Sequence, residues 1–514
     1  MTHIDSVFLK SKICLTCNKV ISGADFDEIK KHQEQGHEVV DDNRDAMQTL
    51  HDAVAPARSF VHNPKILDEI EKDLEGVHVG DKKNKVLALI LLASSKRKDH
   101  EQAIIIQKIS SAGGSNLQDS LLEYFDKKIT LTRMTAAYLD RSMTNYAGKI
   151  LAIGEMSGFD SGSSVIRQKL SEGKTELATT DKDEKGRIIT NILRTEGRPS
   201  FITTTNSFEI HPEFENRCWI LSIDETPNQT KAVNKYQFSK DRFEFEDWKP
   251  SSEIKSLLNS GILEDLRVVN PFAELLGESF PCDNVTARRD SKRFADLTTT
   301  ITYLHQHQRI KIKTQNQLFI ITSFEDLKLA IFYGQDALRN TLNKLDKKAE
   351  SVIGYMKACS KEKELFTRND LCNALEIPYE TMKRILEKLT NRSFVQFEQV
   401  DRVWKYKLSN KSLIDGISFG SEEDFTKTAI QYLKKNASNF EQIILPQKYY
   451  NTTGVDKAIV DYLLSLNVLV TDQNSNRICV AMVPVTTSLS VRVTDTETLQ
   501  IPPPLTTKIE EVDT

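Results

Sequence analysis

A run of small residues between an apolar segment and a helical pattern could bind phosphate. Residues 108–115 read Lys-Ile-Ser-Ser-Ala-Gly-Gly-Ser and follow the apolar run 103–106. In a phosphate-binding loop, the backbone N–H groups of a glycine-rich loop and a helix N-terminus hold a polyphosphate. Of the pattern G-x-x-x-x-G-K-[ST], the second glycine (Gly113) and the hydroxyl for Mg²⁺ (Ser115) are present. An ordinary Gly/Ser turn is the alternative.

Two residues of this segment differ from the phosphate-loop pattern. Lys108 stands at the first glycine, and Gly114 stands where a lysine should reach the β- and γ-phosphates. A charge-assisted hydrogen bond contributes about 1.5–3 kcal/mol, so its loss weakens binding about 10- to 150-fold. Lys108 is an alternative source of the missing charge. The candidate nucleotide contacts are Lys108, Ser110, Ser111, Gly113, Gly114, Ser115 and Asn116.

Polar residues at the ends of later apolar runs complete a possible hydrolytic site. The run 149–153 is followed by Gly154 and Glu155, where a nucleotide motif has two acids, one near Mg²⁺ and one that activates water. The run 199–205 ends at Asn206, and Arg217 precedes another apolar run. Surface ion pairs are the alternative roles of Glu155 and Arg217. Residues 176–194 predict a hairpin whose tip carries Lys182, Lys185 and Arg187, which in the simplest interpretation are solvated.

Near the start of the chain, four residues have the spacing of zinc ligands. Cys14, Cys17, His32 and His37 give C-x2-C-x14-H-x4-H, close to the zinc-finger pattern. A segment this short cannot bury a core, so the metal would supply its folding energy. Chance cysteines and surface histidines are the alternative.

Composition indicates an ordinary soluble protein of several domains. The 514 residues exceed what one core accommodates, which predicts three or four domains. The net charge of −4 restricts nucleic-acid binding to local basic patches. The longest apolar run, 86–93, is too short to cross a membrane. Seven cysteines in this length favour a reducing, cytoplasmic location.

The motifs together, in their order, resemble a known family. The segments SSAGGSNLQDSLLEYF, ITLTRMTAAYLDR, KILAIGEM, LATTDKDEKGRIIT, RTEGRPSFITTTN and ENRCWILSIDETPNQT, with NPFAELL and TARRDSKRF after them, carry the resemblance. They are similar to AAA+ ATPases of phages, plasmids and archaea that are replicative helicases or primase-associated proteins, distantly like minichromosome-maintenance helicases. The resemblance covers about residues 77–309.

The resemblance implies a role for each matching residue. Gly113 and Ser115 would belong to the phosphate loop, Glu155 would be the catalytic glutamate, and Asn206 the first sensor. Arg217 would be the arginine finger that completes the site of the neighbouring subunit in a homo-oligomeric, hexameric ring. The hairpin would contact DNA in a central channel. ATP and Mg²⁺ would be the cofactors, with DNA, a primase or other replication proteins as partners and a nucleoid-associated location.

Beyond this core, residues 351–408 predict a winged helix-turn-helix. Three helices precede two alternating strands, and Pro378 suits the start of the third helix. Lys383, Arg384, Lys388 and Arg392 lie off its apolar face and would contact DNA phosphates. A winged helix that binds protein is the alternative.

The expected fold is α/β plus α. It comprises a zinc module (1–41), a helical connector (42–76), an AAA+ core (77–240), a helical lid (241–347), the winged helix (348–410), a possible second winged helix (420–483) and a disordered tail (484–514). The leading function is a DNA-binding AAA+ ATPase of the replication-helicase type. Gly114 and Gly154 favour an alternative, a scaffold that binds nucleotide or DNA without hydrolysis. A winged-helix transcription regulator is the third hypothesis.

Overall fold

The computed structural model describes most of the chain between residues 54 and 473. The described residues are 12–14, 20–21, 39–41, 54–108, 113–134, 138, 144–155, 163–182, 187–206, 210–242, 247–282, 286–343, 345, 347–360, 364–391, 394–400, 403–409, 419–473, 477–479 and 492–493. The chain divides into two units. One contains residues 1–61 and 252–262, and the other contains the rest.

The smaller unit combines a short sheet with a pair of helices. Strands β1 (Lys12–Cys14), β2 (Val20–Ile21) and β3 (Val39–Asp41) are antiparallel in the order β2-β1-β3. Helix α3 (Ala57–Phe60) packs against α11 (Ser252–Asn259). Helix α11 buries Ile254, Leu257 and Leu258, whose spacing places them on one face. An amphipathic helix from far along the chain therefore joins this unit.

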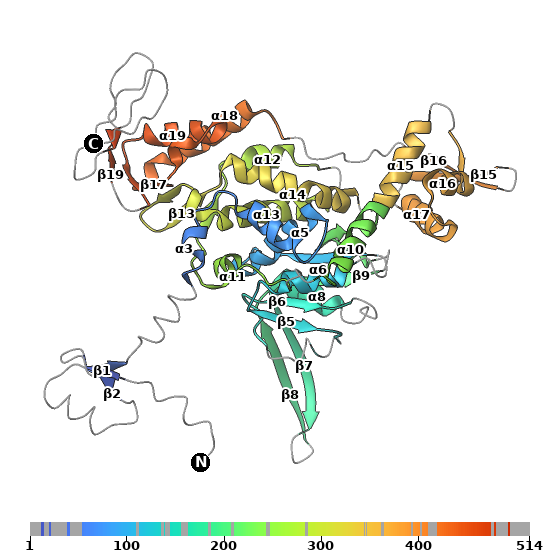
Figure 1. Ribbon diagram of the computed structural model, residues 1–514, viewed down its shortest axis with the longest axis horizontal. Helices are drawn as coiled ribbons and strands as arrows, with labels where there is room; N and C mark the ends of the chain where they lie inside the picture. Colours follow the sequence, from blue (N-terminus) through green and yellow to red (C-terminus); the bar gives the residue numbers. More distant parts are fainter. Residues whose placement is uncertain are drawn as a thin grey trace. The chain divides into compact units, whose positions relative to one another are not determined.

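The larger unit contains a five-stranded parallel sheet, of which β5, β6 and β9 are labelled in Figure 1. Its strands are β4 (Ala103–Gln107), β5 (Lys128–Leu131), β6 (Ile150–Ile153), β9 (Ser200–Thr205) and β10 (Trp219–Ser222), in the order β10-β4-β9-β6-β5. Strands β4, β6, β9 and β10 coincide with the apolar runs of the sequence, whereas β5 is more polar. All four residues of β6 and all six of β9 are buried, as expected for strands covered on both faces.

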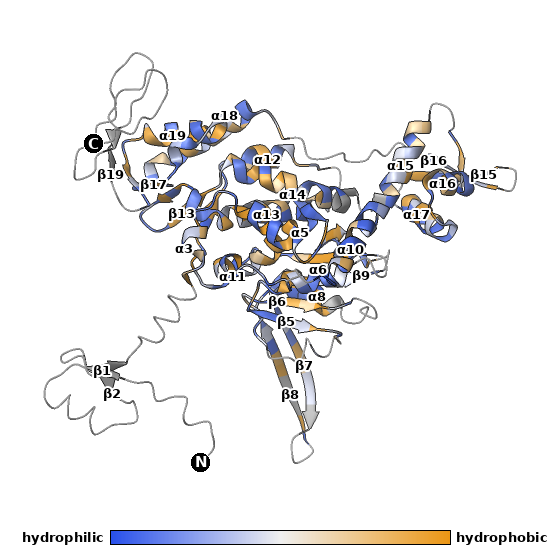
Figure 2. Cartoon of the chain, viewed as in Figure 1, coloured by the Kyte–Doolittle hydropathy of each residue, from blue (hydrophilic) through white to orange (hydrophobic). Residues whose placement is uncertain are grey.

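The helices of the larger unit differ in how much of their surface is buried, in line with their hydrophobicity. Helix α5 (Lys82–Ala93) is buried from residue 85 onward and contacts β4, β9, α13 (Ala287–Leu304) and α14 (Phe324–Asn343). A helix that is apolar on all sides belongs in a core. By contrast, α10 (Pro227–Ser239) buries no residue and is mainly hydrophilic in Figure 2. No helix among the described residues is long and apolar enough to cross a membrane.

The remaining helices of this core are shorter. They are α4 (Ile66–Glu75), α6 (Gly114–Leu122), α8 (Ser163–Glu172), α9 (Pro212–Glu215) and the 3-10 turns η2 (Ser94–Lys96) and η3 (Gln306–Gln308). Between α8 and α9, strands β7 (Lys174–Lys182) and β8 (Ile188–Glu196) form an antiparallel hairpin. This hairpin, predicted from the sequence, is confirmed.

A second sheet joins two regions that the sequence suggested were separate. Strands β11 (Arg267–Val269), β12 (Lys311–Lys313) and β13 (Leu318–Ile321) come from the expected lid. Strands β17 (Gln442–Leu445), β18 (Leu469–Asp472) and β19 (Arg477–Cys479) come from the expected second winged helix. Strand β20 (Arg492–Val493) comes from the segment expected to be a disordered tail, which is therefore ordered at these two residues; most of that segment lies outside the described residues. The order is β11-β13-β12-β17-β18-β19-β20. Because β12 pairs with β17, residues 420–483 are not an independent second winged helix.

Helices α12 (Ala273–Ser279), α18 (Glu422–Asn436) and α19 (Gly454–Leu464), with turns η4 (Ala437–Asn439) and η5 (Tyr449–Asn451), accompany this sheet. Helix α18 packs on both α12 and α19. Phe272, Phe324 and Phe425 meet in pairs, with ring centroids 5.0 to 5.9 Å apart. Aromatic contacts therefore help to join residues that are far apart in the sequence.

The third part of the larger unit has its own core. It contains α15 (Lys347–Cys359), β14 (Phe366–Thr367), α16 (Arg368–Leu375), α17 (Tyr379–Asn391), β15 (Val395–Val400) and β16 (Val403–Leu408), with sheet order β14-β16-β15. Met382, Ile385 and Leu389 of α17 are buried in this core. Thr367 and Asp370 form a capping box at the start of α16.

A buried ion pair lies between α13 and α14. The Asp326 carboxylate accepts hydrogen bonds from Arg309 Nε at 2.7 Å and Arg309 Nη2 at 2.6 Å. Thr302 Oγ1 donates to the same carboxylate at 3.0 Å. Burial alone would raise the pKa of Asp326, but the adjacent Arg309 charge outweighs it and the pKa is lowered. His305 lies 3.8 Å from this carboxylate and donates from Nδ1 to the carbonyl of Ile301.

We expect His305 to make the fold less stable in acid. Burial, assisted by the Arg309 charge, lowers the pKa of His305 to about 4. Below pH ~6.5 the unfolded histidine takes up a proton that the folded one refuses until about pH 4. Stability should therefore be retained above pH ~6.5 and fall by about 3 kcal/mol toward pH 4. Urea unfolding at several pH values should show this slope, and His305→Gln should reduce it. An equal slope in both proteins would contradict the assignment.

Candidate phosphate-binding site

The topology brings three predicted site segments to one edge of the parallel sheet. From β4 the chain crosses to β5 at the far edge, and each later strand returns toward β4 until β10 lies on its other side. Such a reversal creates a ligand crevice at the carboxyl ends of the strands. There, Lys108 N donates to Thr205 O at 2.9 Å, and Thr204 Oγ1 donates to Gly154 O at 2.7 Å. The segments that end in Lys108, Asn206 and Glu155 are therefore neighbours.

Gly113 supplies the turn that begins α6. Its φ is 87°, a left-handed conformation that side chains disfavour, and it occupies the N-cap position. Its carbonyl accepts from Leu117 N at 3.0 Å, the first bond of the helix. The following N–H groups have no helical partner and point out of the helix N-terminus, as anion binding requires. Ser110 and Ser111, predicted contacts, lie outside the described residues.

The side chain of Lys108 occupies the space above Gly114. Its Nζ donates to Ser115 Oγ at 2.7 Å. A Cβ on Gly114 would lie 2.7 Å from Lys108 Cδ, closer than real Cβ atoms approach, and 3.2 and 3.3 Å from the side chains of Ile223 and Ile106. Glycine at position 114 therefore makes room for Lys108. An ammonium group stands beside the serine hydroxyl although the sequence pattern lacks its lysine.

His78 is a site residue that sequence reasoning did not identify. It is buried, and its Cε1 would lie 3.7 Å from a Cβ on Gly113. Its ring nitrogens lie 3.3 Å from Asn116 Oδ1 and 3.2 Å from Asp81 Oδ2. Asp81 also accepts from the backbone N–H of Asp224 at 2.8 Å. These contacts join three distant segments beside the loop. In the sequence, the pair Gly80-Asp81 before α5 indicates a turn, and this was the one available indication of the site.

The second predicted motif has a steric reason for its missing acid. Glu155 and Asn206 are both exposed at the edge of the sheet. A Cβ on Gly154 would lie 3.3 Å from the backbone carbonyl oxygen of Thr132. Any side chain at this position would therefore require the Thr132 backbone to shift by a few tenths of an ångström. Glu155 is therefore the one acid of this motif.

Arg217 lies in a cluster of basic side chains. Its Nε donates to Ser171 Oγ at 2.8 Å, and its Nη1 donates to the carbonyl of Glu213. Burial lowers the pKa of Arg217, and the charges of Arg289 and Arg167 lower it further. Arg167 itself pairs with the Glu213 carboxylate. The guanidinium is half-buried and hydrogen-bonded within the chain, and a concentrated positive charge surrounds it.

Basic residues of the hairpin and of the small helical module are partly described. On the hairpin, Arg187 and Ile188 are exposed, whereas Lys185 and the side chain of Lys182 lie outside the described residues. On α17, Lys383 and Arg384 are exposed and Lys388 is half-buried, while Arg392 lies outside the described residues. Residues 347–409 contain thirteen lysines and arginines and nine aspartates and glutamates, although the whole chain is acidic.

Two aromatic side chains extend the apolar face of this module toward solvent. Phe397 and Trp404 are 52% and 49% exposed, and their ring centroids lie 5.3 Å apart in an edge-to-face arrangement. Gln399 pairs with Trp404 and Phe397 with Tyr406, so both rings share the face that buries Val395 and Tyr406. The face therefore continues past the core as an exposed aromatic pair.

The predicted zinc ligands are mostly untested. Cys14 is the last residue of β1, whereas Cys17, His32 and His37 lie outside the described residues. Among the residues that are described, no group of three or more histidine, cysteine, aspartate or glutamate side chains is placed to hold a metal ion. The zinc site stays a prediction.

Comparisons with known proteins find only distant structural similarity. No protein-family model and no curated protein matches the sequence. A candidate ATPase from Cytophaga hutchinsonii is 12% identical with a TM-score of 0.34, and the match covers 67% of this chain and 98% of that one. A full-length MCM homolog from Methanopyrus kandleri is 10% identical with a TM-score of 0.34, covering 59% and 63%. The Aeropyrum pernix ORC1 protein, solved with DNA, is 10% identical with a TM-score of 0.23, covering 73% and 97%. These similarities are low, so the functional argument rests on the geometry of this chain.

Proposed function

We propose that this chain is a DNA-binding ATPase of the AAA+ type, in which Lys108 replaces the lysine of the phosphate loop. The observation that carries the proposal is the hydrogen bond from Lys108 Nζ to Ser115 Oγ above Gly114. An ammonium, a serine hydroxyl and a helix N-terminus then meet beside one loop. Together they suit the phosphates and the metal ion of a nucleoside triphosphate.

Each of the candidate site residues at the carboxyl edge of the parallel sheet would have one role. The Gly113 turn and the first N–H groups of α6 would hold phosphate oxygens, and Lys108 would neutralise their charge. Ser115 Oγ accepts from Lys108 and keeps acceptor capacity for Mg²⁺, which would polarise the phosphate. Glu155 would take a proton from the attacking water, and Asn206 would orient that water.

The ring assembly is part of the proposal. Arg217, surrounded by Arg167 and Arg289, would act on nucleotide bound by a neighbouring copy, where its charge stabilises the transition state. The exposed hairpin β7–β8 would contact DNA with Lys182, Lys185 and Arg187.

Zinc would be bound in the smaller unit by Cys14, Cys17, His32 and His37. The zinc content of the purified protein tests this.

Phosphate release from ATP, with and without single-stranded DNA, tests the proposed activity. We expect turnover that DNA stimulates, and a loss of about 100-fold or more in Glu155→Gln, since general-base catalysis contributes about 10²–10⁴. Glu123→Gln, on an exposed residue after α6, is the matched control. If the native chain binds ATP but releases no phosphate, the activity proposal fails.

One observation favours a second candidate, a scaffold that binds nucleotide and DNA without hydrolysis. The contact between position 154 and the Thr132 carbonyl leaves little room for the acid that normally assists Mg²⁺. Such a protein would bind ATP and DNA, and its DNA affinity would fall steeply with salt. Absence of turnover together with retained binding of both ligands would select this candidate.

We further propose that residues 347–409 form a winged helix that binds DNA. The helix and strand order, the exposed Lys383 and Arg384 on α17, and the excess of basic residues support this. The aromatic pair on its hairpin suits stacking on a nucleobase.

Trp404→Ala should weaken DNA binding about tenfold, because base stacking contributes about 1–3 kcal/mol. Fluorescence anisotropy with a labelled oligonucleotide at fixed salt would measure it. Val403→Ala is the matched control, since Val403 is 47% exposed on the opposite face of the same hairpin. Equal losses in the two variants, or none in Trp404→Ala, would contradict a stacking role.

A further inference from the structure

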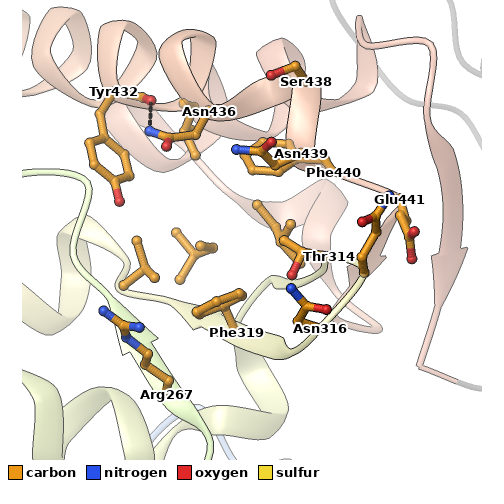
Figure 3. Close-up of a pocket in the computed structure, with 15 residues that line it drawn as sticks. Arg267, Thr314, Asn316, Phe319, Tyr432, Asn436, Ser438, Asn439, Phe440 and Glu441 are labelled. Atoms are coloured by element: carbon orange, nitrogen blue, oxygen red, sulfur yellow. Dashed lines mark hydrogen bonds between the residues drawn. The ribbon is translucent and has the colours of Figure 1, made fainter.

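A cavity of about 470 Å³ lies between the second sheet and the end of α18 (Figure 3). Strands β11, β12 and β13 provide one side, and residues 432–441 provide the other. Figure 3 shows the side chains of Arg267, Phe319 and Tyr432 directed toward the space between them. None of the described residues of the phosphate loop lines it. Its volume is in the range of small-molecule sites.

The floor of this cavity is apolar. Val269, Ile312 and Ile321 line it from the strands, and Leu433 lines it from α18. Ile312 and Leu433 are only 1% exposed, so the floor is part of the core. Phe319 and Phe440 add aromatic rings to the walls. A flat apolar ligand would displace water from these surfaces at little cost in conformational entropy, because the sheet already fixes them.

Polar groups stand around this floor. The Arg267 guanidinium lies 5.8 Å from the centroid of the Phe319 ring and makes no ion pair within the described part of the chain. The amides of Asn316 and Asn439 have no protein hydrogen-bond partner among the described residues, although they line the cavity. The Asn436 amide, in contrast, donates to Tyr432 O at 2.8 Å. An exposed cation and two exposed amides therefore stand at the rim of an apolar, aromatic space, and the carboxylate of Glu441 also lines it.

We propose that this cavity binds a nucleotide unit, that is, one base with its phosphate, either free or within single-stranded DNA. Aromatic rings and the apolar floor suit the faces of a base. Each amide offers both a donor and an acceptor, as the edge of a base requires. The planar Arg267 fork suits a phosphate. This is a second site, and it does not depend on ATP hydrolysis at the phosphate loop.

Photocrosslinking of the full chain tests the location. The probes are 5-bromodeoxyuridine monophosphate and a single-stranded oligodeoxynucleotide that carries one 5-bromodeoxyuridine. We expect crosslinks in residues 312–321 or 432–441, identified by mass spectrometry. Crosslinking by both probes assigns the site to the nucleotide unit itself, and crosslinking by the oligonucleotide alone assigns it to DNA. If neither probe crosslinks to these segments, the proposal is overturned.

Two variants distinguish binding in the cavity from an effect of net charge alone. Arg267→Gln should weaken probe binding about 10- to 150-fold, the effect of one charge-assisted hydrogen bond. Lys313→Gln is the matched control, because Lys313 is exposed on β12 next to Ile312 but does not line the cavity. Equal losses in both variants would show that only net charge matters and would overturn the proposal.

The test is also independent of the proposed ATPase. Lys108→Ala should leave the crosslinks in residues 312–321 and 432–441 unchanged, and Arg267→Gln should leave ATP turnover unchanged. If Lys108→Ala abolishes these crosslinks, the probe binds through the phosphate loop and the cavity proposal fails. A chain without ATP turnover that still crosslinks at the cavity would keep this inference and reject the proposed activity.

Discussion

Lys108→Ala should lower ATP turnover at saturating ATP by about 100-fold or more, since one electrostatic donor at a developing charge contributes about 10²–10³. No other lysine contacts the described part of the loop, and Lys108 Nζ lies 2.7 Å from Ser115 Oγ. Its ammonium is therefore the group placed to stabilise charge on the transferred phosphate. Phosphate release measures the effect. Lys128→Ala is the control, because Lys128 donates to the Leu122 carbonyl at the other end of α6.

The space above Gly114 makes a sharper version of this test possible. Gly114→Lys alone should gain no activity, because the new Cβ would lie 2.7 Å from Lys108 Cδ and the flexible Lys108 side chain would have to leave its place beside Ser115. The double variant Lys108→Ala with Gly114→Lys removes that clash and should recover part of the turnover. Ile106 and Ile223 must then shift by a few tenths of an ångström, which limits the recovery. If Lys108→Ala keeps full activity, Lys108 does not replace the missing lysine.

Asp326→Ala should lower the free energy of unfolding by about 3–5 kcal/mol, the cost of breaking a buried ion pair from one side. It would leave the Arg309 guanidinium, which now makes two hydrogen bonds to Asp326, buried without a carboxylate. Thr302 Oγ1 and the backbone N–H of Ser323 would lose the same acceptor. Chemical denaturation of the full chain measures the change.

A neighbouring acid provides the control for this prediction. Glu325 is about half exposed and pairs with Lys328 at 2.7 Å on the surface of α14. Glu325→Ala should therefore cost at most about 1 kcal/mol. Similar losses in the two variants would mean that the buried pair is not especially important, and that any acid at the start of α14 acts in the same way.

Strands β4, β6 and β9 of the first sheet were predictable from the sequence because each is a short run of mostly buried residues followed by polar ones, whereas β5 has no buried residue. Asn206 and Glu155 follow such runs, and parallel strands bring their carboxyl ends to one edge. The sequence did not determine where the Lys108 side chain lies. The space for it comes from the absence of a Cβ at residue 114, six residues later, and a sequence pattern does not show such a contact.

Other contacts depend on tertiary packing alone. His78 and Asn116 are far apart in the sequence, and neither belongs to a periodic pattern that would indicate a contact. The pairing of β12 with β17 was missed because both strands are short, and a helix-rich segment separates them. Short strands carry little pattern, so their partners are decided by which unpaired backbone edges meet in the folded chain.

The pairing of β12 with β17 also has a consequence for synthesis. A ribosome must release residues 314–441 before β12 can reach this neighbour, although β13 is available much earlier. Residues 347–409, which have their own core, can fold during this delay. Until translation reaches residue 442, one side of β12 remains an open edge that can pair with another nascent chain. Chains cut short before that residue should therefore aggregate during expression.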